Sequence, residues 1–475
     1  MSREKDFIKN TAIYMIGNLS SKLLIFLLLP IYTIYLTTKE YGYYDIIYTT
    51  VSLIVPLISL QIYDGIYRFA LDARNDAALI NKYISNALAI VGIAFVGTVP
   101  LIVILQLASN IEYLNLIYLQ IIMTSIFNLW QMIARGLKKN TLFAVSGIIM
   151  TASMLFLNIL FIVVLHFSVK ALIVSNIIAL AIAVLFLEYK LGITKIFKFR
   201  YISKDVMKQL ILYSLPLVPN SISWWILNLS NRYIISFYIG NDYNGIYAVS
   251  SKFPAIIMMV NMVFNLAWQD TAIYEKDAKD REQFYSKMFN YFLELQLAFL
   301  IIIIPFVKVF SNVAIGNEFT DAVNYIPILM LSTFFQCFST FFCSFYYLNK
   351  KTNGLLYTTL IGAIANIVIT IIFISKIELY ATSMATVFSS IIVVALRHIY
   401  VRKIFKIEIN IKVTKFLFYI LILSLNYIIY YEASTYLNAI MFFISILGLG
   451  IANKNYLFKC IEIVHRNFRV VEINK

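Results

Sequence analysis

Residues 83–108, YISNALAIVGIAFVGTVPLIVILQLA, contain no charged side chain and are long enough to cross a lipid bilayer as one helix. A membrane-spanning helix needs about 20 apolar residues. Backbone N–H and C=O groups find no partner in hydrocarbon, so a stretch of this kind is stable there only as a helix or within a closed barrel. This segment therefore predicts an α-helical membrane protein.

The rest of the chain has the same character. Of 475 residues, 61% are hydrophobic and 13% are charged, and the mean hydropathy is +0.82, whereas soluble domains contain about 25% charged residues. This composition excludes a soluble globular protein. We expect an all-α integral membrane protein with fourteen transmembrane helices, over residues 10–35, 42–63, 83–108, 112–134, 141–166, 168–189, 209–239, 245–269, 286–310, 322–348, 354–375, 379–400, 415–432 and 434–452.

Positive charge alternates from one connection to the next. With the N-terminus in the cytoplasm, 32 of the 39 Lys and Arg residues fall on the inner side, and the outer connections carry only Lys39, Lys170, Lys308 and Lys376. Lys and Arg concentrate in the cytoplasmic loops of membrane proteins. The bias predicts cytoplasmic N- and C-termini, and it explains the formal charge of +15 without a nucleic-acid partner.

The longest inner connection is basic and divides the first twelve predicted spans into two groups of six. We expect an N-terminal lobe over 1–189, a cytoplasmic linker over 190–208, a C-terminal lobe over 209–400, two additional helices over 401–452 and a basic cytoplasmic tail over 453–475. The charge of the linker is more typical of attraction to anionic lipid headgroups than of a substrate site. The outer connections are short, so no external catalytic or receptor domain is expected.

An internal repeat relates the two lobes. An offset of 203 residues places Ile31–Leu36 on Ile234–Ile239, and Gly42 on Gly245. An even number of predicted spans separates the two copies, so they have the same orientation in the membrane. Parallel repeats of this kind occur in transporters that move two lobes about a site near the middle of the membrane.

Several of these segments resemble those of a known family. They are similar to polysaccharide-export flippases, the Wzx-like branch of the multidrug/oligosaccharidyl-lipid/polysaccharide exporter superfamily, at Phe7-Ile8-Lys9-Asn10, Leu36–Tyr44, Ile239–Tyr247, Arg68 and Asn231-Arg232-Tyr233. The length, the number of spans and the six-plus-six repeat followed by two helices agree over most of the chain. The sequence departs from many members at Trp268-Gln269-Asp270, where they have a proline after the tryptophan.

The resemblance implies a flippase of the bacterial inner membrane rather than an enzyme. Its substrate would be an undecaprenyl-pyrophosphate-linked oligosaccharide, moved from the inner to the outer leaflet by alternating access. The product would serve a capsule, an O-antigen or a similar surface polymer. The implied partners are this lipid, the membrane, and a polysaccharide polymerase with other enzymes of the pathway.

Three cations lie in the body of predicted spans, away from the ends: Lys22, Arg232 and Lys252. A Lys or Arg at the centre of a span costs about 2.5 to 3.5 kcal/mol on insertion scales, so these side chains should face a watery cavity or find partners. Asn18 and Asn228 each lie four residues before one of them, on the same helical face. Because Arg and Lys both bind phosphate, we expect these five residues to contact the pyrophosphate in a central cavity.

Acidic residues are the candidates for coupling to a proton or sodium gradient. Glu294 lies about two turns inside the ninth span and is the strongest, and Asp270 is either a second candidate or a structural partner of Arg232. Asp64 and Arg68 are four residues apart near the inner end of the second span. For them a local ion pair is favoured over coupling by Asp64 or a cytoplasmic gate at Arg68.

Motifs of other protein classes are missing from the sequence. There is no GxxxxGK[ST] loop and no HExxH, and Cys337, Cys343 and Cys460 lack the spacing of zinc ligands. We therefore expect no cofactor, no metal and no ATP hydrolysis. A cation-coupled multidrug exporter of the same superfamily and a lipid II flippase remain alternatives. A membrane polymerase or glycosyltransferase is disfavoured, because that class generally needs a sizeable exposed loop.

Overall fold

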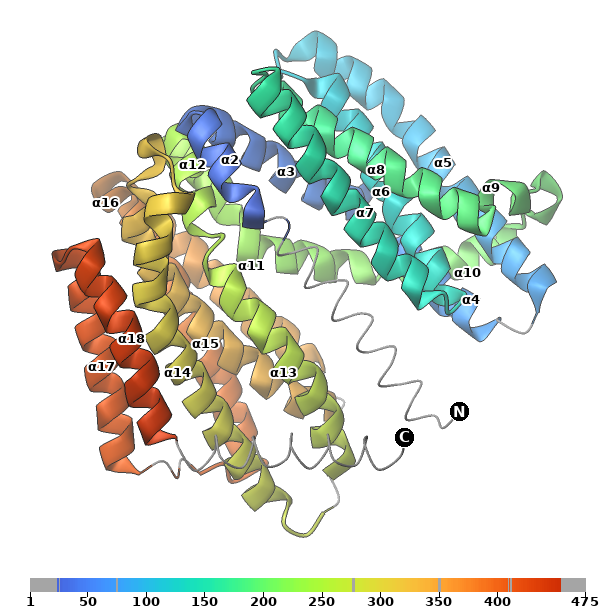
Figure 1. Ribbon diagram of the computed structural model, residues 1–475. Coiled ribbons are helices and arrows are strands. Elements are labelled where there is room, and N and C mark those ends of the chain that lie inside the picture. The colour runs from blue at the N-terminus through green and yellow to red at the C-terminus, as the bar shows by residue number, and fades with distance from the viewer. Residues whose placement is uncertain are drawn as a thin grey trace, which may run out of the picture. The chain divides into compact units, whose positions relative to one another are not determined.

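The computed structural model describes residues 24, 26–73, 76–275, 278–348, 352–408, 410 and 412–453 (Figure 1). This part of the chain consists of helices joined by short connections, and it contains no β-strand. The predicted all-α membrane architecture is confirmed. Most of the predicted first span lies outside the described residues, which include its outer end as α2 (Leu29–Tyr35).

The helices follow the predicted spans closely. Up to the middle of the chain they are α3 (Thr38–Ile58), α4 (Ile62–Asp72), α5 (Ala77–Ala108), α6 (Leu114–Gly136), α7 (Asn140–Asn158) with a π-helical end η1 (Ile159–Val164), α8 (Val169–Leu191), α9 (Ile193–Ile196), η2 (Phe199–Tyr201), α10 (Lys204–Ser214) and α11 (Leu217–Tyr238). The remaining helices are α12 (Asn241–Ser250), α13 (Pro254–Tyr274), α14 (Arg281–Ala314), η4 (Asn317–Phe319), α15 (Ala322–Leu348), α16 (Thr352–Arg402), α17 (Val413–Glu432) and α18 (Thr435–Ala452).

Ten helices of the described residues are long and apolar enough to cross a membrane, or up to twelve if two bent pairs each count as one span. One such pair is α3 and α4, which bend by 53° around Gln61 in a left-handed conformation. Helix α16 contains two predicted spans, because Ile377 and Glu378 have non-helical dihedral angles at the predicted boundary. The total of fourteen spans and the inward orientation of both termini stay predictions.

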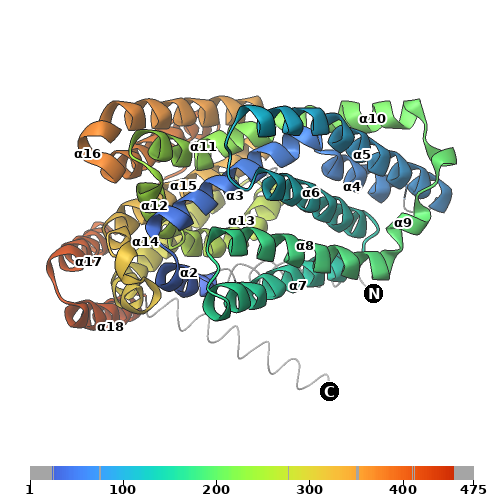
Figure 2. The same cartoon turned by 90° about the horizontal axis from the view of Figure 1, so that it is seen from above.

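The chain folds into two compact units. Unit 1 comprises Met1–Lys252, Ile315–Thr320 and Asn353–Ser389, and unit 2 comprises Phe253–Ala314, Asp321–Thr352 and Ser390–Lys475. In unit 1, α5, α6, α7 and α8 run side by side, and α12 packs along α3 (Figure 2). The first helices of the predicted C-terminal lobe therefore belong to unit 1. The predicted lobe boundaries themselves are not tested by this division.

Unit 2 is built on an aromatic core. The indole of Trp268 on α13 stacks on the ring of Phe341 on α15 at 4.5 Å, and Tyr285 of α14 meets the same indole edge-on at 5.8 Å. All three side chains are fully buried. Helices α17 and α18 pack against α14 in the same unit. This packing fixes the N-terminal part of α14, which also carries polar side chains.

In unit 1 the connection between α9 and α10 is held against the long helix α5. Asn86 of α5 donates from Nδ2 to the Tyr201 carbonyl (2.8 Å), and its Oδ1 accepts from the Ser203 N–H (2.9 Å). Ser85 holds the same connection at the Ile196 carbonyl and the Lys198 N–H. We call residues 196–203 the linker strap. Ser85 bonds the two residues that flank Phe197, and Asn86 bonds the two that flank Ile202; both flanked residues have extended backbones, one before and one after the 3-10 helix η2.

In unit 2 the same pattern recurs on α14. Asn290 donates to the Glu408 carbonyl (2.9 Å) and accepts from the Asn410 N–H (2.9 Å), while Ser286 bonds the Lys406 carbonyl and the Glu408 N–H. We call the segment with Lys406, Glu408 and Asn410 the tail strap. Since α5 and α14 contain the third predicted span of their respective lobes, the common arrangement agrees with the internal repeat.

Replacing Asn86 by alanine is expected to loosen the linker strap, because two backbone groups would lose their partner at a cost of about 1 to 3 kcal/mol. Limited trypsin digestion of the protein in nanodiscs should then cleave faster after Lys195, Lys198 and Arg200. Asn115→Ala provides the control, since Asn115 is an exposed residue of α6. Equal cleavage rates in the two variants would show that Asn86 does not hold the strap.

Candidate functional site

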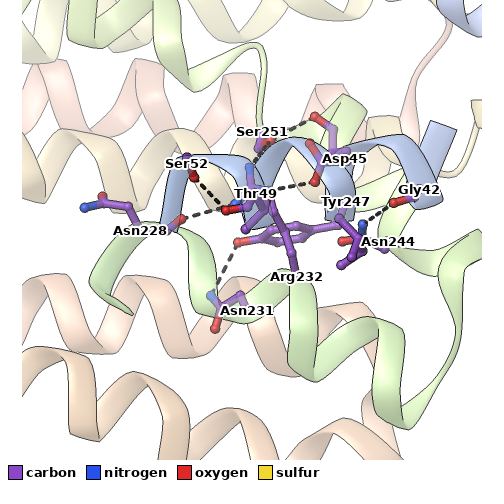
Figure 3. Close-up of polar contacts among 12 residues, drawn as sticks. Gly42, Asp45, Thr49, Ser52, Asn228, Asn231, Arg232, Asn244, Tyr247 and Ser251 are labelled. Carbon is purple, nitrogen blue, oxygen red and sulfur yellow. Dashed lines mark hydrogen bonds and ion pairs between the residues drawn. The ribbon is translucent and has the colours of Figure 1, made fainter. Parts of the chain in front are cut away.

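A buried ion pair joins α11 to α3 in unit 1. The Nε of Arg232 lies 2.7 Å from Oδ2 of Asp45 (Figure 3), and only 8% of the arginine and 4% of the aspartate are exposed. The other guanidinium nitrogens donate to the Asn228 carbonyl (3.1 Å) and to Oγ of Ser251 (3.3 Å). The ring of Tyr247 lies 5.7 Å from the guanidinium carbon. Arg232 is therefore fixed in one geometry by groups from α3, α11 and α12.

Lys252 adds a second cation to this place. It lies two residues after the end of α12, is half-buried, and lies within electrostatic reach of both Asp45 and Arg232. Within the part of the chain that the structure describes, no carboxylate lies within ion-pair distance of Lys252. We call Asp45, Arg232 and Lys252 the charge cluster; with each side chain ionised, the three sum to one positive charge.

The structure brings together three of the five residues predicted to contact pyrophosphate. Arg232, Lys252 and Asn228 are neighbours, although Asn228 contributes its backbone carbonyl and its side chain bonds the Trp224 carbonyl (2.8 Å). Lys22 and Asn18 lie outside the described residues. The predicted structural partner of Arg232 was Asp270, whose side chain also lies outside the described part, and the partner in the structure is Asp45.

The predicted ion pair between Asp64 and Arg68 is wrong. Arg68 pairs instead with Asp72, four residues further along α4, at 3.3 Å, and both side chains are more than half exposed. Asp64 lies on a half-buried face, within reach of the charge of Arg135. Asp64 and Asp72 both lie four residues from Arg68, so the spacing fits either acid. Arg68 is exposed and pairs with the exposed Asp72, whereas Asp64 is half-buried.

Glu294, the leading candidate for coupling, has a cationic partner. Its Oε2 lies 2.7 Å from Nζ of Lys415 on α17, and the side chains are 14% and 18% exposed. Neither Asp45 nor Lys415 was identified from the sequence. A signal for Asp45 exists, because it is a lone acid at the outer end of an apolar run. Lys415 gives no such signal, since it follows a basic inner connection.

Close to the charge cluster, α3 and α12 touch through glycines at the repeat spacing. A Cβ atom on Gly42 would overlap the backbone oxygen of Asn241, and one on Gly245 would overlap that of Thr38. Thr38 and Asn241 are themselves repeat partners, so the contact is nearly symmetric. Asn244 adds a hydrogen bond from Nδ2 to the Gly42 carbonyl (2.8 Å; Figure 3).

Solved structures share this fold. The chain resembles the lipid II flippase MurJ in an inward closed conformation, with a TM-score of 0.69 and 15% identity over 94% of this chain and 99% of that one. It also resembles an inward-facing multidrug resistance transporter of the MATE family in the MOP superfamily, with a TM-score of 0.64 and 12% identity over 83% and 98%. No curated protein matches the sequence significantly.

A family model described as "Polysaccharide biosynthesis protein" matches residues 7–274, which is more than half of the chain. The matched region includes Asp45, Arg232 and Lys252. Family and fold both point to membrane transporters rather than enzymes, and the described helices are those of a multi-pass membrane protein. The chain belongs to the polysaccharide biosynthesis family of flippases in the multidrug/oligosaccharidyl-lipid/polysaccharide exporter superfamily.

Proposed function

We propose that this protein moves undecaprenyl-pyrophosphate-linked oligosaccharide from the inner to the outer leaflet of a bacterial cytoplasmic membrane. The glycan would serve a capsule, an O-antigen or a similar surface polymer, and would pass to a polysaccharide polymerase and other enzymes of the pathway. In this mechanism the headgroup enters a polar path through the protein while the lipid tail stays in the bilayer. Alternating access then exposes the headgroup on the opposite side.

The observation that carries the proposal is the excess positive charge of the charge cluster. A charge within a membrane protein is costly and marks substrate or ion pathways when it is retained. Asp45 neutralises one of the two cations, so Lys252 remains to attract an anion. A pyrophosphate offers several oxygens to such a cation, and Arg232 stays fixed beside it.

A second candidate is lipid II flipping. The MurJ structure aligns with 94% of this chain, whereas the MATE transporter aligns with 83%. Both candidate substrates place a pyrophosphate between a polyprenyl tail and a sugar, so the charge cluster suits either. A cation-coupled multidrug exporter is less well supported, because a cationic drug would be repelled by the excess positive charge.

Coupling to a proton or sodium gradient belongs to the proposal. Glu294, Asp64 and Asp270 are the candidate residues, and of these the Glu294 carboxylate is held by Lys415. Neutralising the Glu294 carboxylate would weaken this contact between α14 and α17. Translocation should therefore depend on the gradient, and Glu294→Gln should remove that dependence.

The test is transbilayer movement of fluorescent undecaprenyl-pyrophosphate oligosaccharide in proteoliposomes, with and without a proton or sodium gradient. Lys252→Ala is expected to slow movement about tenfold, since a charge-assisted hydrogen bond contributes about 1.5 to 3 kcal/mol. Lys170→Ala is the control, because Lys170 is an exposed cation at the start of α8. Faster movement of lipid II than of the oligosaccharide would favour the second candidate. Gradient-driven dye efflux without lipid movement would contradict both.

A further inference from the structure

Unit 2 contains a polar cavity of about 540 Å³ that is separate from the charge cluster. It lies between the first turns of α14 and the tail strap, so it is complete within unit 2. Pockets that hold small ligands have volumes of about 300 to 1,000 Å³. Most of them are lined by apolar groups, whereas polar and charged side chains line this one. The cavity therefore has the size of a ligand site but suits a strongly polar ligand.

Side chains on two adjacent faces of α14 line this cavity. The buried row, Ser286 and Asn290, holds the tail strap by hydrogen bonds and so fixes one wall. The second row, Gln283, Lys287 and Tyr291, is exposed and repeats every four residues on the adjacent face. The hydrogen bonds of Ser286 and Asn290 thus fix the position of the strap relative to the exposed row of α14.

The charges around the cavity balance. Glu282, Glu294 and Glu408 are its carboxylates, and they are matched by Lys287 and Lys406 in the lining and by Lys415 in its ion pair with Glu294. A neutral site has no net attraction for a pyrophosphate. The lining instead offers acceptors on the glutamates and both donors and acceptors on the amides, which is the mixture that hydroxyl groups require.

An aromatic side chain adds an apolar surface to this polar site. Tyr291 lines the cavity and is 37% exposed, and Nζ of Lys287 lies 5.8 Å from its ring centre. A sugar ring has an apolar face of C–H groups between its hydroxyls, so it can pack on an aromatic ring while its hydroxyls bond the surrounding amides and carboxylates. The combination of Tyr291 with Gln283 and Glu282 fits a saccharide better than a lipid tail or an inorganic ion.

The cavity also lies at the depth of a lipid-linked sugar. Along α14, Lys287 and Lys308 are about 31 Å apart at 1.5 Å per residue, which matches the hydrocarbon thickness of a bilayer. The residues around Lys287 would therefore lie at the membrane surface, on the side that the charge bias predicts to be cytoplasmic. A sugar attached to a membrane-embedded lipid is held at this depth by its own anchor.

We infer that this cavity binds the saccharide portion of a lipid-linked glycan at the membrane surface. The inference rests on the proposed function and names the sugar, not the pyrophosphate, as the group that unit 2 recognises. The protein then has two separate places of contact with its substrate: a neutral sugar site on α14 and the tail strap, and a cationic site on α3, α11 and α12.

Saturation-transfer NMR on the full-length protein in nanodiscs tests the inference. The probes are free glucose, galactose, rhamnose, N-acetylglucosamine, N-acetylgalactosamine and glucuronic acid. At least one neutral sugar is expected to give a signal that Tyr291→Ala lowers at least fivefold and Tyr291→Phe retains. Tyr189→Ala is the matched control, because Tyr189 is 83% exposed and has a lysine Nζ 5.1 Å from its ring centre but lines no part of the cavity.

The inference is overturned if no sugar in this set gives a signal that depends on Tyr291, or if Tyr189→Ala lowers the signal equally. Lys252→Ala should leave sugar binding unchanged while it slows lipid translocation. Translocation by the wild type without Tyr291-dependent sugar binding would therefore refute only the sugar site. Sugar binding without translocation would refute the proposed function and leave the sugar site standing.

Discussion

Replacing Arg232 by alanine is expected to destabilise the protein by about 3 to 5 kcal/mol, because the buried carboxylate of Asp45 would lose its partner. Asp45 is 4% exposed and lies 2.7 Å from the guanidinium. Thermal unfolding of the purified protein in detergent measures the loss. Arg68→Ala is the control, because the ion pair of Arg68 with Asp72 is exposed to solvent. Such a pair contributes about 0 to 1 kcal/mol.

The double variant Asp45→Ala with Arg232→Ala separates stability from transport. Removing both charges leaves no unpaired ion, so the double variant should be more stable than either single variant. The coupling free energy from the four proteins should exceed about 2 kcal/mol. If the two single losses simply add, the ion pair does not stabilise this contact.

Lipid translocation by the same double variant gives the second readout. A variant that regains stability but moves no lipid would show that the arginine acts on the substrate as well as on Asp45. A double variant that moves lipid at the wild-type rate would contradict a role of Arg232 in headgroup binding. In that case Lys252 would be the remaining cation of the charge cluster.

The fold was predictable because hydropathy and charge act locally along the chain. The predicted spans in the described residues are helical, although 42–63, 209–239 and 245–269 are each divided between two helices. The boundary between 375 and 379 falls on the break at Ile377 and Glu378. The only dihedral irregularity inside α16 lies where a charged residue interrupts the apolar run. Hydropathy therefore predicts which residues lie within a membrane-spanning helix, but it does not predict which helices pack together.

The partners of the charged residues depend on those neighbours and were missed. Asp45 and Arg232 are 187 positions apart, and Glu294 and Lys415 are 121 apart. A single sequence identified Arg232 and Glu294 because charges in apolar spans stand out. It could not pair them, since several acids and bases satisfied the same requirement. The predicted ion pair between Asp64 and Arg68 was wrong for a related reason: the spacing of two residues in the sequence does not show how deeply each side chain is buried.

The repeat related two distant segments of the chain, although it did not by itself predict that they touch. The offset of 203 residues placed Gly42 on Gly245, and in the structure these two glycines lie where α3 and α12 meet. Small residues let helix backbones approach closely within membranes. A residue that matches at the repeat spacing and lacks a side chain is therefore informative about helix contact, even within apolar sequence where matches arise easily.

Gly42→Ala and Gly245→Ala are expected to separate α3 from α12. The added methyl group would overlap a backbone oxygen, which cannot move aside as a side chain does. Overpacking costs about 1 to 3 kcal/mol, and loss of the hydrogen bond from Asn244 to the Gly42 carbonyl costs about 1 to 3 kcal/mol more. The unfolding temperature should fall in both variants. Gly97→Ala in α5 is the matched control, because nothing lies within 4 Å of its added Cβ and alanine favours a helix.

Separation of the helices can be measured directly by cross-linking. Oγ1 of Thr38 lies 3.1 Å from Oδ1 of Asp242, so a short bifunctional thiol reagent should cross-link the pair Thr38→Cys with Asp242→Cys. Adding Gly42→Ala should lower the cross-linking yield, whereas adding Gly97→Ala should not. Because Asp45 is one turn from Gly42 on α3, the same displacement should weaken the ion pair with Arg232. Unchanged yields and unfolding temperatures in the Gly42 and Gly245 variants would show that the two repeats are not held together by this contact.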